Sequence, residues 1–401
     1  MVKHVTPTYI ADSHSFGEFV ARLREHDRVA LDTEFVGEDT FVPRLELIQI
    51  SAGALSAVVD FPAVGSLGAF GEVLGDPRIE KVVHAGRQDL ELFHAHTHVV
   101  PTPVFDTQMA AAMVGYGAQV AYAQLVQRIL GVKLDKAHTF TNWSHRPLSK
   151  DQIVYAFEDV HYLLPVHEHL RARLEKLGRV EWAQEEFARL GTRLTDGSRE
   201  PRQRYQRIRG WDNLKPRAAA VLRDLVAWRE EEARRRNVPR GRVVRDEVLL
   251  EMARQGPVTL SALKSMRGLH PTEAERSGEA LLETIKRAGA LSESEWPDVP
   301  KARRPEPEAS GQVDLLQAVL KAVALEQEIA SNVLASTADL QALVDAKQDR
   351  SQLDLPILQG WRRRLAGEQL VAVLDGKVAA CLDRQSGKLV LRPVPEGPLT
   401  G

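Results

Sequence analysis

One short stretch, from Val29 to Phe35, constrains this chain more than any other, because apolar and β-branched residues surround two acidic residues. Such a run is typical of a short β-strand. Side chains alternate across a strand, so Asp32 and Glu34 point to the same face. Carboxylates held close together repel each other, and a divalent cation with hard oxygen ligands removes that conflict. The alternative is an edge strand with two solvated acids, and this stretch alone does not decide between them.

The composition is that of a protein with two or three globular domains. The chain has 401 residues, of which 43% are hydrophobic and 27% charged. No apolar run approaches the roughly 20 residues of a transmembrane helix, and the N-terminus lacks a secretory apolar core. The single cysteine, Cys381, excludes an internal disulfide and a thiolate zinc cluster. We therefore expect a cytoplasmic protein that does not bind membranes.

Strands and helices alternate through the first half of the chain. We expect strands at 29–35, 45–50 and 57–61 to be antiparallel, because short turns connect them. Periodic apolar residues predict helices at 15–26, 67–74, 88–96 and 107–114, with further strands at 81–84 and 104–106. A helix from Ser149 runs to Leu164 and is kinked at Pro165, and another at 180–190 closes the domain. The pattern predicts a mixed sheet covered by helices.

The second half of the chain is predicted to be helical. Helices are expected near 216–236, 245–255, 259–264 and 272–288, and a second helical block runs from Val313 to about Leu374. The segment 195–211 is a linker candidate, and the tail from Val378 to Val394 forms a hairpin. The predicted boundaries are a first domain at 1–193, a helical domain at 212–291, a linker at 292–311, a second helical domain at 312–375 and a tail at 376–401.

Three more acidic positions accompany Asp32 and Glu34. Asp89 lies at the start of a helix just after a strand, where sites built on sheets collect. Tyr155 and Asp159 are four residues apart and share one helix face. Asp106 precedes a helix, and we assign it to capping rather than to metal binding.

Arginines are locally concentrated although the net charge is −2, which gives no global attraction to a polyanion. One cluster surrounds Tyr205 and Trp211, and a second follows; they comprise Arg199, Arg202, Arg204, Arg207, Arg209, Lys215, Arg217, Arg234, Arg235, Arg236, Arg240, Arg242 and Arg245. Such clusters neutralise nucleic-acid phosphates, and the aromatic rings could stack on bases. The alternative is a solvated helix face, since Glu230, Glu231 and Glu232 lie in the same stretch.

The acidic set together with Tyr155 resembles the motifs of the DEDD exonucleases, in the subclass with a tyrosine four residues before the last aspartate. The surrounding sequence resembles the bacterial ribonuclease D family more closely, in order over about residues 10 to 190. The matching segments are Ala30 to Phe35, Leu47-Ile48-Gln49, His84-Ala85-Gly86 with Asp89-Leu90-Glu91, Asp106-Thr107-Gln108, Leu134-Asp135-Lys136, Trp143 with Arg146-Pro147-Leu148, and Tyr155 to Pro165. The two helical blocks resemble HRDC domains, the C-terminal module of helicases and ribonuclease D.

The resemblance implies an α/β ribonuclease-H-like exonuclease domain followed by two all-α HRDC-like domains. It also implies two divalent ions, Mg²⁺ or Mn²⁺, about 4 Å apart at the scissile phosphate. Asp32 would bridge both ions, Glu34 and Asp159 would complete the site of one, and Asp89 would act on the other. Tyr155, with an ordinary pKa near 10, would orient the attacking water rather than act as a base.

Other residues are candidates for contact with the substrate. These are Phe35, Gln49, His84, Trp143, Arg146, Arg204, Arg207 and Arg209. His84 could reach the terminal nucleotide, or it could be a buried strand-end residue that bonds the backbone, and Gln49 and Phe35 leave the same choice open. His94, His96 and His98 alternate, but no acid or cysteine accompanies them, so we interpret them as solvated histidines rather than as a metal site.

The expected function is that of a monomeric, metal-dependent 3′→5′ exoribonuclease. The family implies structured RNA 3′ ends, such as those of tRNA precursors, as substrate and nucleoside 5′-monophosphates as product. One alternative is the same chemistry on DNA, because discrimination depends on contacts to the 2′-hydroxyl and not on the metal site. Another alternative is a non-catalytic RNA-binding scaffold, which the complete set of acids with Tyr155 argues against.

Overall fold

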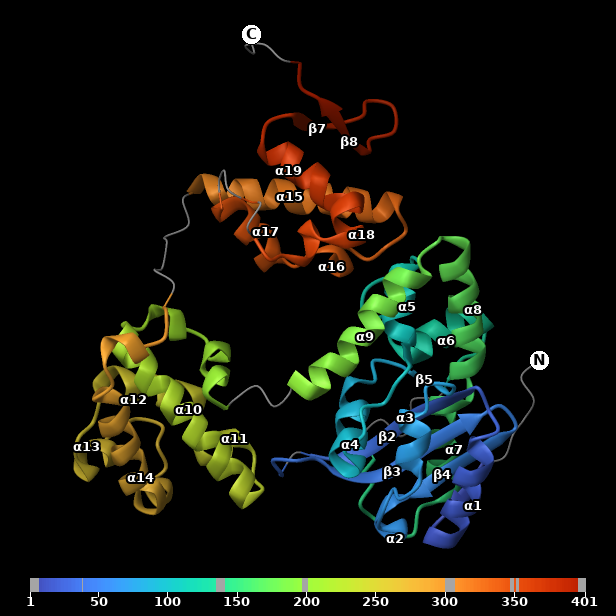
Figure 1. The fold of residues 1–401 in the computed structure, drawn as a ribbon, viewed down its shortest axis with the longest axis horizontal. Helices are drawn as coiled ribbons and strands as arrows, with labels where there is room; N and C mark the ends of the chain where they lie inside the picture. Colours follow the sequence, from blue (N-terminus) through green and yellow to red (C-terminus); the bar gives the residue numbers. More distant parts are fainter. Residues whose placement is uncertain are drawn as a thin grey trace.

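A six-stranded mixed sheet forms the centre of the first half of the chain (Figure 1). The computed structural model describes residues 7–37, 39–134, 141–196, 201–299, 307–346, 350 and 353–395, so Asp135, Lys136 and Arg199 lie outside it. The strands are β1 (Thr8–Ile10), β2 (Arg28–Val36), β3 (Arg44–Ala52), β4 (Leu55–Asp60), β5 (Glu80–Val83) and β6 (Val104–Asp106), in the order β1-β4-β3-β2-β5-β6. The prediction of three antiparallel strands is confirmed, because β2 and β4 both pair antiparallel with β3.

Parallel pairs extend the sheet on both sides, which makes it mixed as predicted. The short strand β1, which the sequence pattern does not reveal, pairs with β4. The helices of this half are α1 (Ser13–Leu23), α2 (Phe61–Val64), α3 (Phe70–Gly75), α4 (Arg87–Thr97), α5 (Thr107–Met113), α6 (Tyr122–Leu130), α7 (Lys150–His161), α8 (Leu163–Lys176) and α9 (Val180–Asp196).

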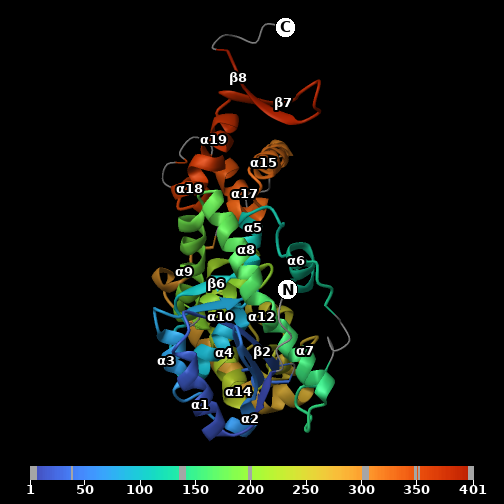
Figure 2. The same cartoon turned by 90° about the vertical axis from the view of Figure 1, so that its right-hand side faces the viewer.

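The two faces of the sheet support two different cores (Figure 2). Leu31 and Ile48 face a core shared with α1, α3 and α4. Ala30 and Leu47 face the opposite side, where α5, α7 and α8 pack. Because side chains alternate along β2, the carboxylates of Asp32 and Glu34 lie on the second face, beneath α7.

The helix predicted to run through Pro165 is in fact two helices. A capping box starts α7, in which Gln152 N donates to Ser149 Oγ at 3.1 Å and Ser149 N donates to Gln152 Oε1 at 2.8 Å. This helix ends at His161, and α8 begins at Leu163. Pro165 therefore lies in the first turn of α8, where its missing N–H costs no helical hydrogen bond.

The first helical unit is larger than the sequence predicts. It contains η1 (Pro201–Arg207), η2 (Trp211–Asn213), α10 (Pro216–Arg236), α11 (Arg240–Val243), α12 (Asp246–Gln255), α13 (Leu260–Lys264), α14 (Pro271–Gly289) and η3 (Glu293–Glu295). The interpretation of 195–211 as a linker is wrong for its second part, because Tyr205 and Ile208 are buried in the core of this unit. Tyr205 is a core aromatic packed edge-on against Trp211, and its ring is not presented to a base.

The loop after β2 docks on the first helical unit. Two guanidinium groups lie over the ring of Phe41. The ring centroid is 5.6 Å from Cζ of Arg234 and 4.5 Å from Cζ of Arg240. Asp39 pairs with Arg242 in the same contact, and Val42 N donates to Asn237 Oδ1 at 3.4 Å. The segment that follows Asp32 and Glu34 is thus attached to the end of α10 and to α11.

A second helical unit packs on α5, α8 and α9 and shares a core with them (Figure 1). It contains α15 (Pro307–Glu326), α16 (Ser331–Leu334), α17 (Thr337–Asp345), η4 (Pro356–Leu358), α18 (Gly360–Arg362), the π-helical turn η5 (Arg363–Gly367) and α19 (Glu368–Leu374). The predicted hairpin follows as β7 (Val378–Leu382) and β8 (Leu389–Pro393), which pair antiparallel. Among the described helices, none has the length and apolar character that crossing a membrane requires.

Arg179 holds this second unit on the half of the chain that contains the six-stranded sheet. Its guanidinium is 5% exposed and donates to Met113 O at 2.6 Å and to Glu328 O at 3.2 Å. It also donates to the carbonyl of Gln327. Nearby, Trp182 of α9 stacks on Trp361 of α18 with ring centroids 4.6 Å apart.

We expect Arg179→Met to lower the free energy of unfolding by about 3 kcal/mol, because it leaves buried carbonyls without donors. The control is Arg173→Met, which removes a partly exposed ion pair to Glu328 and should cost less than about 1 kcal/mol. Urea denaturation of both variants measures the difference. Equal losses would contradict the importance of the buried contacts.

Candidate active site

Three carboxylates converge between the sheet and α7. Asp32 and Glu34 come from β2, and Asp159 comes from α7. One carboxylate oxygen from each residue lies within 4.8 Å of those of the other two, and each side chain is half-buried. The sequence analysis places Asp32 and Glu34 together by strand alternation, and the fold adds Asp159 from more than 120 residues away.

Burial and mutual repulsion disfavour the charged forms of these acids. Burial raises the pKa of Asp32 well above its ordinary value, and the charges of Asp89 and Asp159 raise it further. The same causes, again led by burial, raise the pKa of Glu34 to about 8. Burial and the neighbouring Glu158 and Asp89 raise the pKa of Asp159 to about 7. A positive charge placed among these acids would relieve their repulsion.

A divalent cation fits this arrangement. Carboxylate oxygens are the ligands that hard cations prefer, and three of them lie close enough to share one ion. A cation would also supply the positive charge that the acids lack. The histidines at 94, 96 and 98 lie elsewhere and have other contacts: His94 Nδ1 lies 3.2 Å from Val99 O, and the ring of His96 packs against Phe61.

Asp89 lies in the first turn of α4, directly after a tight turn, and its charge acts on Asp32, although its carboxylate is not among the three that lie within 4.8 Å of one another. Asp106 fixes that turn, because its carboxylate accepts from Ala85 N and Gly86 N at 3.2 Å each. It also accepts from Gln108 N at 2.8 Å, which confirms its assignment as the cap of α5. Gly86 is required here, since a Cβ would lie 2.5 Å from the side chain of Val83. Thr33 Oγ1, on the other face of β2, donates to Asp89.

Tyr155 lies one turn before Asp159 on α7. Its ring stacks on Trp143, with centroids 6.3 Å apart and planes 22° apart. Trp143 itself is buried, so it supports Tyr155 from the loop and has little surface to offer a substrate.

The sequence analysis does not identify Tyr122, which supports the same helix. Its hydroxyl donates to Glu158 O at 3.1 Å and accepts from Tyr162 N at 3.2 Å, at the break between α7 and α8. Burial and the charge of Asp159 raise the pKa of Tyr122 well above its ordinary value, so the hydroxyl stays a donor. No spacing rule connects Tyr122 with residues of α7, and only the fold brings them together.

Three substrate candidates near the strands have different environments. His84 is paired on both sides, with Nδ1 2.9 Å from Thr107 Oγ1 and Nε2 3.0 Å from Val120 O. Burial lowers the pKa of His84, which favours the neutral ring and the structural interpretation. Gln49 is fully buried, and neither atom of its amide has a hydrogen-bond partner among the described residues. Phe35 is half-buried against the core on the far face.

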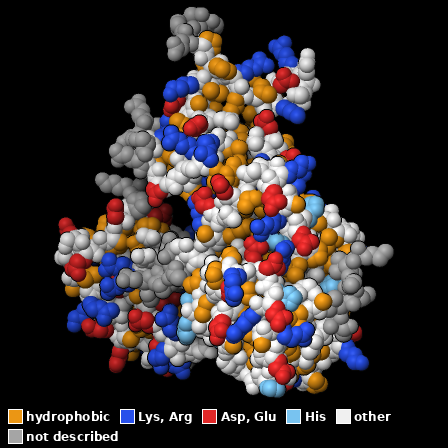
Figure 3. Space-filling model, turned by 45° about the vertical axis from the view of Figure 1, so that its right-hand side comes forward, with side chains coloured by type: hydrophobic (Ala, Val, Ile, Leu, Met, Phe, Trp, Pro, Cys, Tyr) orange, Lys and Arg blue, Asp and Glu red, His pale blue; other side chains and the backbone are white. Residues whose placement is uncertain are grey.

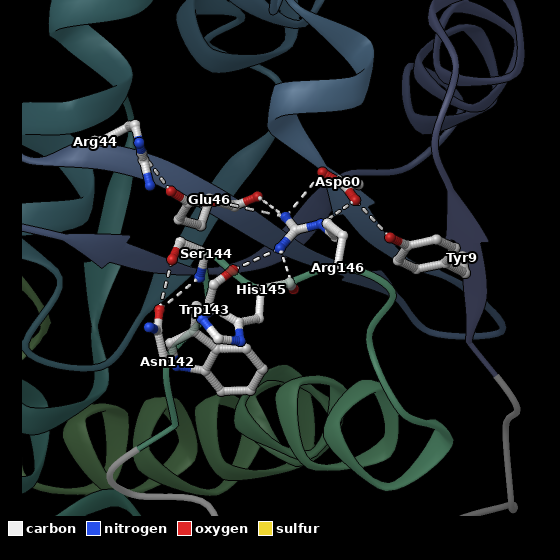
Figure 4. Close-up of polar contacts among 9 residues, drawn as sticks. All are labelled: Tyr9, Arg44, Glu46, Asp60, Asn142, Trp143, Ser144, His145 and Arg146. Atoms are coloured by element: carbon white, nitrogen blue, oxygen red, sulfur yellow. Dashed lines mark hydrogen bonds and ion pairs between the residues drawn. The ribbon is translucent and has the colours of Figure 1, made fainter.

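Arg146 belongs to a network inside the fold (Figure 4). Its Nη2 donates to Asp60 Oδ1 at 2.9 Å and lies 3.6 Å from Glu46 Oε2, while Nη1 donates to His145 O at 3.0 Å. Asp60 also accepts from the hydroxyl of Tyr9 on β1. The guanidinium thus anchors the loop that carries Trp143, and two carboxylates already compensate its charge.

Three basic candidates, Arg204, Arg207 and Arg209, belong to the first helical unit. Arg204 is half-buried and lies 3.5 Å from Glu230, whereas Arg207 and Arg209 are exposed. Arg204 and Arg207 line a pocket of about 390 Å³ together with Ile208, Arg229, Glu230, Arg240, Gly241, Arg245, Asp246 and Glu247. The pocket walls carry five arginines and three acids. On the face drawn in Figure 3, by contrast, basic and acidic side chains are interspersed.

Comparison with known proteins identifies the family. Residues 7–175 match the model of the 3'-5' exonuclease domain, and residues 218–285 match that of the HRDC domain. A ribonuclease D of Granulibacter bethesdensis is 39% identical over 96% of this chain and 97% of its own length. The chain belongs to the ribonuclease D family. A second family member, from Acidiphilium cryptum, is 39% identical over 93% of this chain and 94% of its own length.

A solved structure agrees with this membership of the ribonuclease D family. Escherichia coli RNase D, described as an exoribonuclease involved in structured RNA processing, matches with a TM-score of 0.83 and 31% identity. The match covers 93% of this chain and 99% of the other. The expected fold, an exonuclease domain with a mixed sheet followed by HRDC-type helical structure, is therefore confirmed.

The raised pKa values predict how stability of the metal-free protein depends on pH. The folded state binds more protons than the unfolded chain between about pH 4 and pH 8, so stability falls as pH rises through this window. We expect the melting temperature in chelator to fall from pH 5 to pH 8 and Mg²⁺ to reverse most of the loss at pH 8. The double variant Glu34→Gln and Asp159→Asn should weaken both effects. A melting temperature in chelator that rises over this range would contradict the repulsion.

Proposed function

We propose that this chain is a metal-dependent 3′→5′ exoribonuclease that trims the 3′ ends of structured RNA, such as tRNA precursors, and releases nucleoside 5′-monophosphates. The observation that carries the proposal is the convergence of Asp32, Glu34 and Asp159 within 4.8 Å. This cluster lies in a domain that matches the 3'-5' exonuclease model. The similar E. coli enzyme, described as acting in structured RNA processing, supports the choice of substrate class.

The proposed site holds two divalent cations, Mg²⁺ or Mn²⁺. Asp32 would contact both, Glu34 and Asp159 one, and Asp89 the other. Bound cations supply Lewis-acid charge at a phosphate in hydrolysis of this kind. Tyr155 lies one turn before Asp159, and Trp143 fixes its ring, so its hydroxyl is suited to orient the attacking water. Thr33 keeps Asp89 in place by donating to its carboxylate.

The arginine-lined pocket supports a second contact with RNA, to a backbone phosphate away from the cleaved end. Glu230 lies next to both Arg204 and Arg240, and Asp246 pairs with Arg229. Arg207 and Arg245 add further positive charge to the same walls. A pre-formed pocket with excess guanidinium groups suits a phosphate oxyanion.

We further propose a domain division and a cellular context. The exonuclease domain spans 1–193. The first HRDC-like unit continues past its predicted end at 291, because η3 and Val299 still belong to it. The second HRDC-like unit begins with α15 at Pro307, inside the predicted linker 292–311, and ends near 375. Burial of Tyr205 supports starting the first helical unit near residue 201. We propose that the protein acts as a monomer in the cytoplasm, and a single cysteine is consistent with that compartment.

Asp32→Asn tests the proposal most simply, because it removes one negative ligand and keeps the side-chain shape. We expect release of nucleoside monophosphate from RNA to fall at least about a thousandfold, with the circular dichroism spectrum unchanged. Asp39→Asn, on the docking loop outside the cluster, is the matched control and should keep near-normal activity. Near-normal turnover by Asp32→Asn would refute the metal-dependent mechanism.

Tyr155→Phe separates a catalytic from a packing role of the tyrosine. The ring can still stack on Trp143, so the fold should persist. We expect kcat to fall about a hundredfold, while the dissociation constant for RNA, measured in Ca²⁺, stays within about twofold. A variant with a lower melting temperature and unchanged kcat would instead show that the hydroxyl serves only the core.

The double variant Arg207→Ala and Arg245→Ala tests the phosphate contact. We expect RNA to bind more weakly and the slope of log affinity against log salt to fall by about one or two, because counterion release is lost. Hydrolysis of a dinucleotide, too short to reach the pocket, should be unchanged. An unaltered salt slope would mean that the arginines only stabilise the helical unit.

A further inference from the structure

Gln49 carries a free-energy cost for the folded state. It is 0% exposed, and among the described residues neither its Nε2 nor its Oε1 has a hydrogen-bond partner. A buried amide without partners costs about 1–3 kcal/mol relative to a paired one. An apolar side chain of similar size would fill the same space without this cost, so packing alone does not explain a glutamine here.

The strand pairing places Gln49 beside the acidic cluster. It lies on β3 directly opposite Asp32 of β2, so both side chains are on the same face. Directly opposed residues in an antiparallel pair have Cβ atoms roughly 5 Å apart. On its other side, Gln49 lies opposite Val58 of β4, which offers no polar group.

The polar neighbours of Gln49 on β4 already have partners. The diagonal positions on β4 are Ser56 and Asp60, as the register shows. Ser56 Oγ lies 3.0 Å from Ser51 Oγ, and Asp60 accepts from Tyr9 and Arg146. The carboxylates of Asp32 and, diagonally, Glu34 are the acceptors that remain within reach of this amide on β2 and β4.

An amide is suited to this position because it carries no charge. A lysine or arginine opposite Asp32 would neutralise the carboxylate and compete with a cation for it. The NH₂ group of glutamine donates hydrogen bonds and leaves the negative charge available. Groups of this kind, which contact metal ligands and not the metal, orient the ligands and tune their affinity.

We propose that Gln49 is a positioning residue whose amide, when a divalent cation is bound, donates to the Asp32 carboxylate, directly or through one buried water, and fixes its orientation for that cation. This role rests on the proposed function, since it needs a cation at the cluster. It distinguishes Gln49 from Phe35 and His84, which are satisfied by the core and by the backbone.

The test measures Mn²⁺ affinity by electron paramagnetic resonance together with the melting temperature in chelator. Gln49→Met removes the amide and keeps the volume, and Gln49→Leu is the second variant. We expect either variant to bind Mn²⁺ at least about tenfold more weakly, with an unchanged or higher melting temperature in chelator. Ser51→Ala, which breaks a paired hydroxyl on the same strand, should show the reverse: a lower melting temperature and unchanged Mn²⁺ affinity.

Two results would overturn the role of Gln49. One is unchanged Mn²⁺ affinity in both Gln49 variants. The other is a fall in melting temperature that matches that of Ser51→Ala, because Gln49 would then serve the fold. Failure of the proposed function looks different. The wild-type protein would then either not bind Mn²⁺ or bind it equally well after Asp32→Asn.

Discussion

Repulsion among half-buried carboxylates is the constraint on which the rest of this structure depends. The folded chain brings Asp32, Glu34 and Asp159 within 4.8 Å of one another, and burial raises the pKa of each. Such an arrangement raises the free energy of the folded state, and clusters of this kind are typical of functional sites. The α4 turn fixed by Asp106 and the hydroxyl of Thr33 position Asp89, and the stack of Trp143 on Tyr155 supports α7, which carries Asp159.

The two helical units contact the exonuclease half in different ways. The second unit shares a core with α5, α8 and α9, and Arg179 fastens it there. The first unit contacts the loop that follows β2, through Phe41 beneath Arg234 and Arg240. Because β2 carries Asp32 and Glu34, this loop joins the first helical unit to the strand that holds two of the clustered acids. RNA held by the neighbouring arginine pocket would lie close to the contact between this loop and the first helical unit.

The sequence reveals those parts of the site that follow from local geometry. Strand alternation places Asp32 beside Glu34, and helix periodicity places Tyr155 on the side of Asp159, because both rules act over a few residues. Residues that are far apart in the sequence but meet in the fold leave no such pattern in the sequence. Arg146 looks like a free cation in the sequence, yet its acceptors on Asp60 and Glu46 lie 86 and 100 residues away. Tyr205 likewise stands among arginines, and only the fold shows that it is buried.

The most direct test of the account follows the 3′ end of an RNA. A 5′-labelled tRNA precursor with a 3′ extension would be incubated with the protein in Mg²⁺, in Mn²⁺ and in chelator, beside DNA of the same sequence. We expect a ladder that shortens from the 3′ end on RNA, only with metal, and little shortening of the DNA. A label that stays at full length in both metals would contradict the account, and the acidic cluster would then need another explanation.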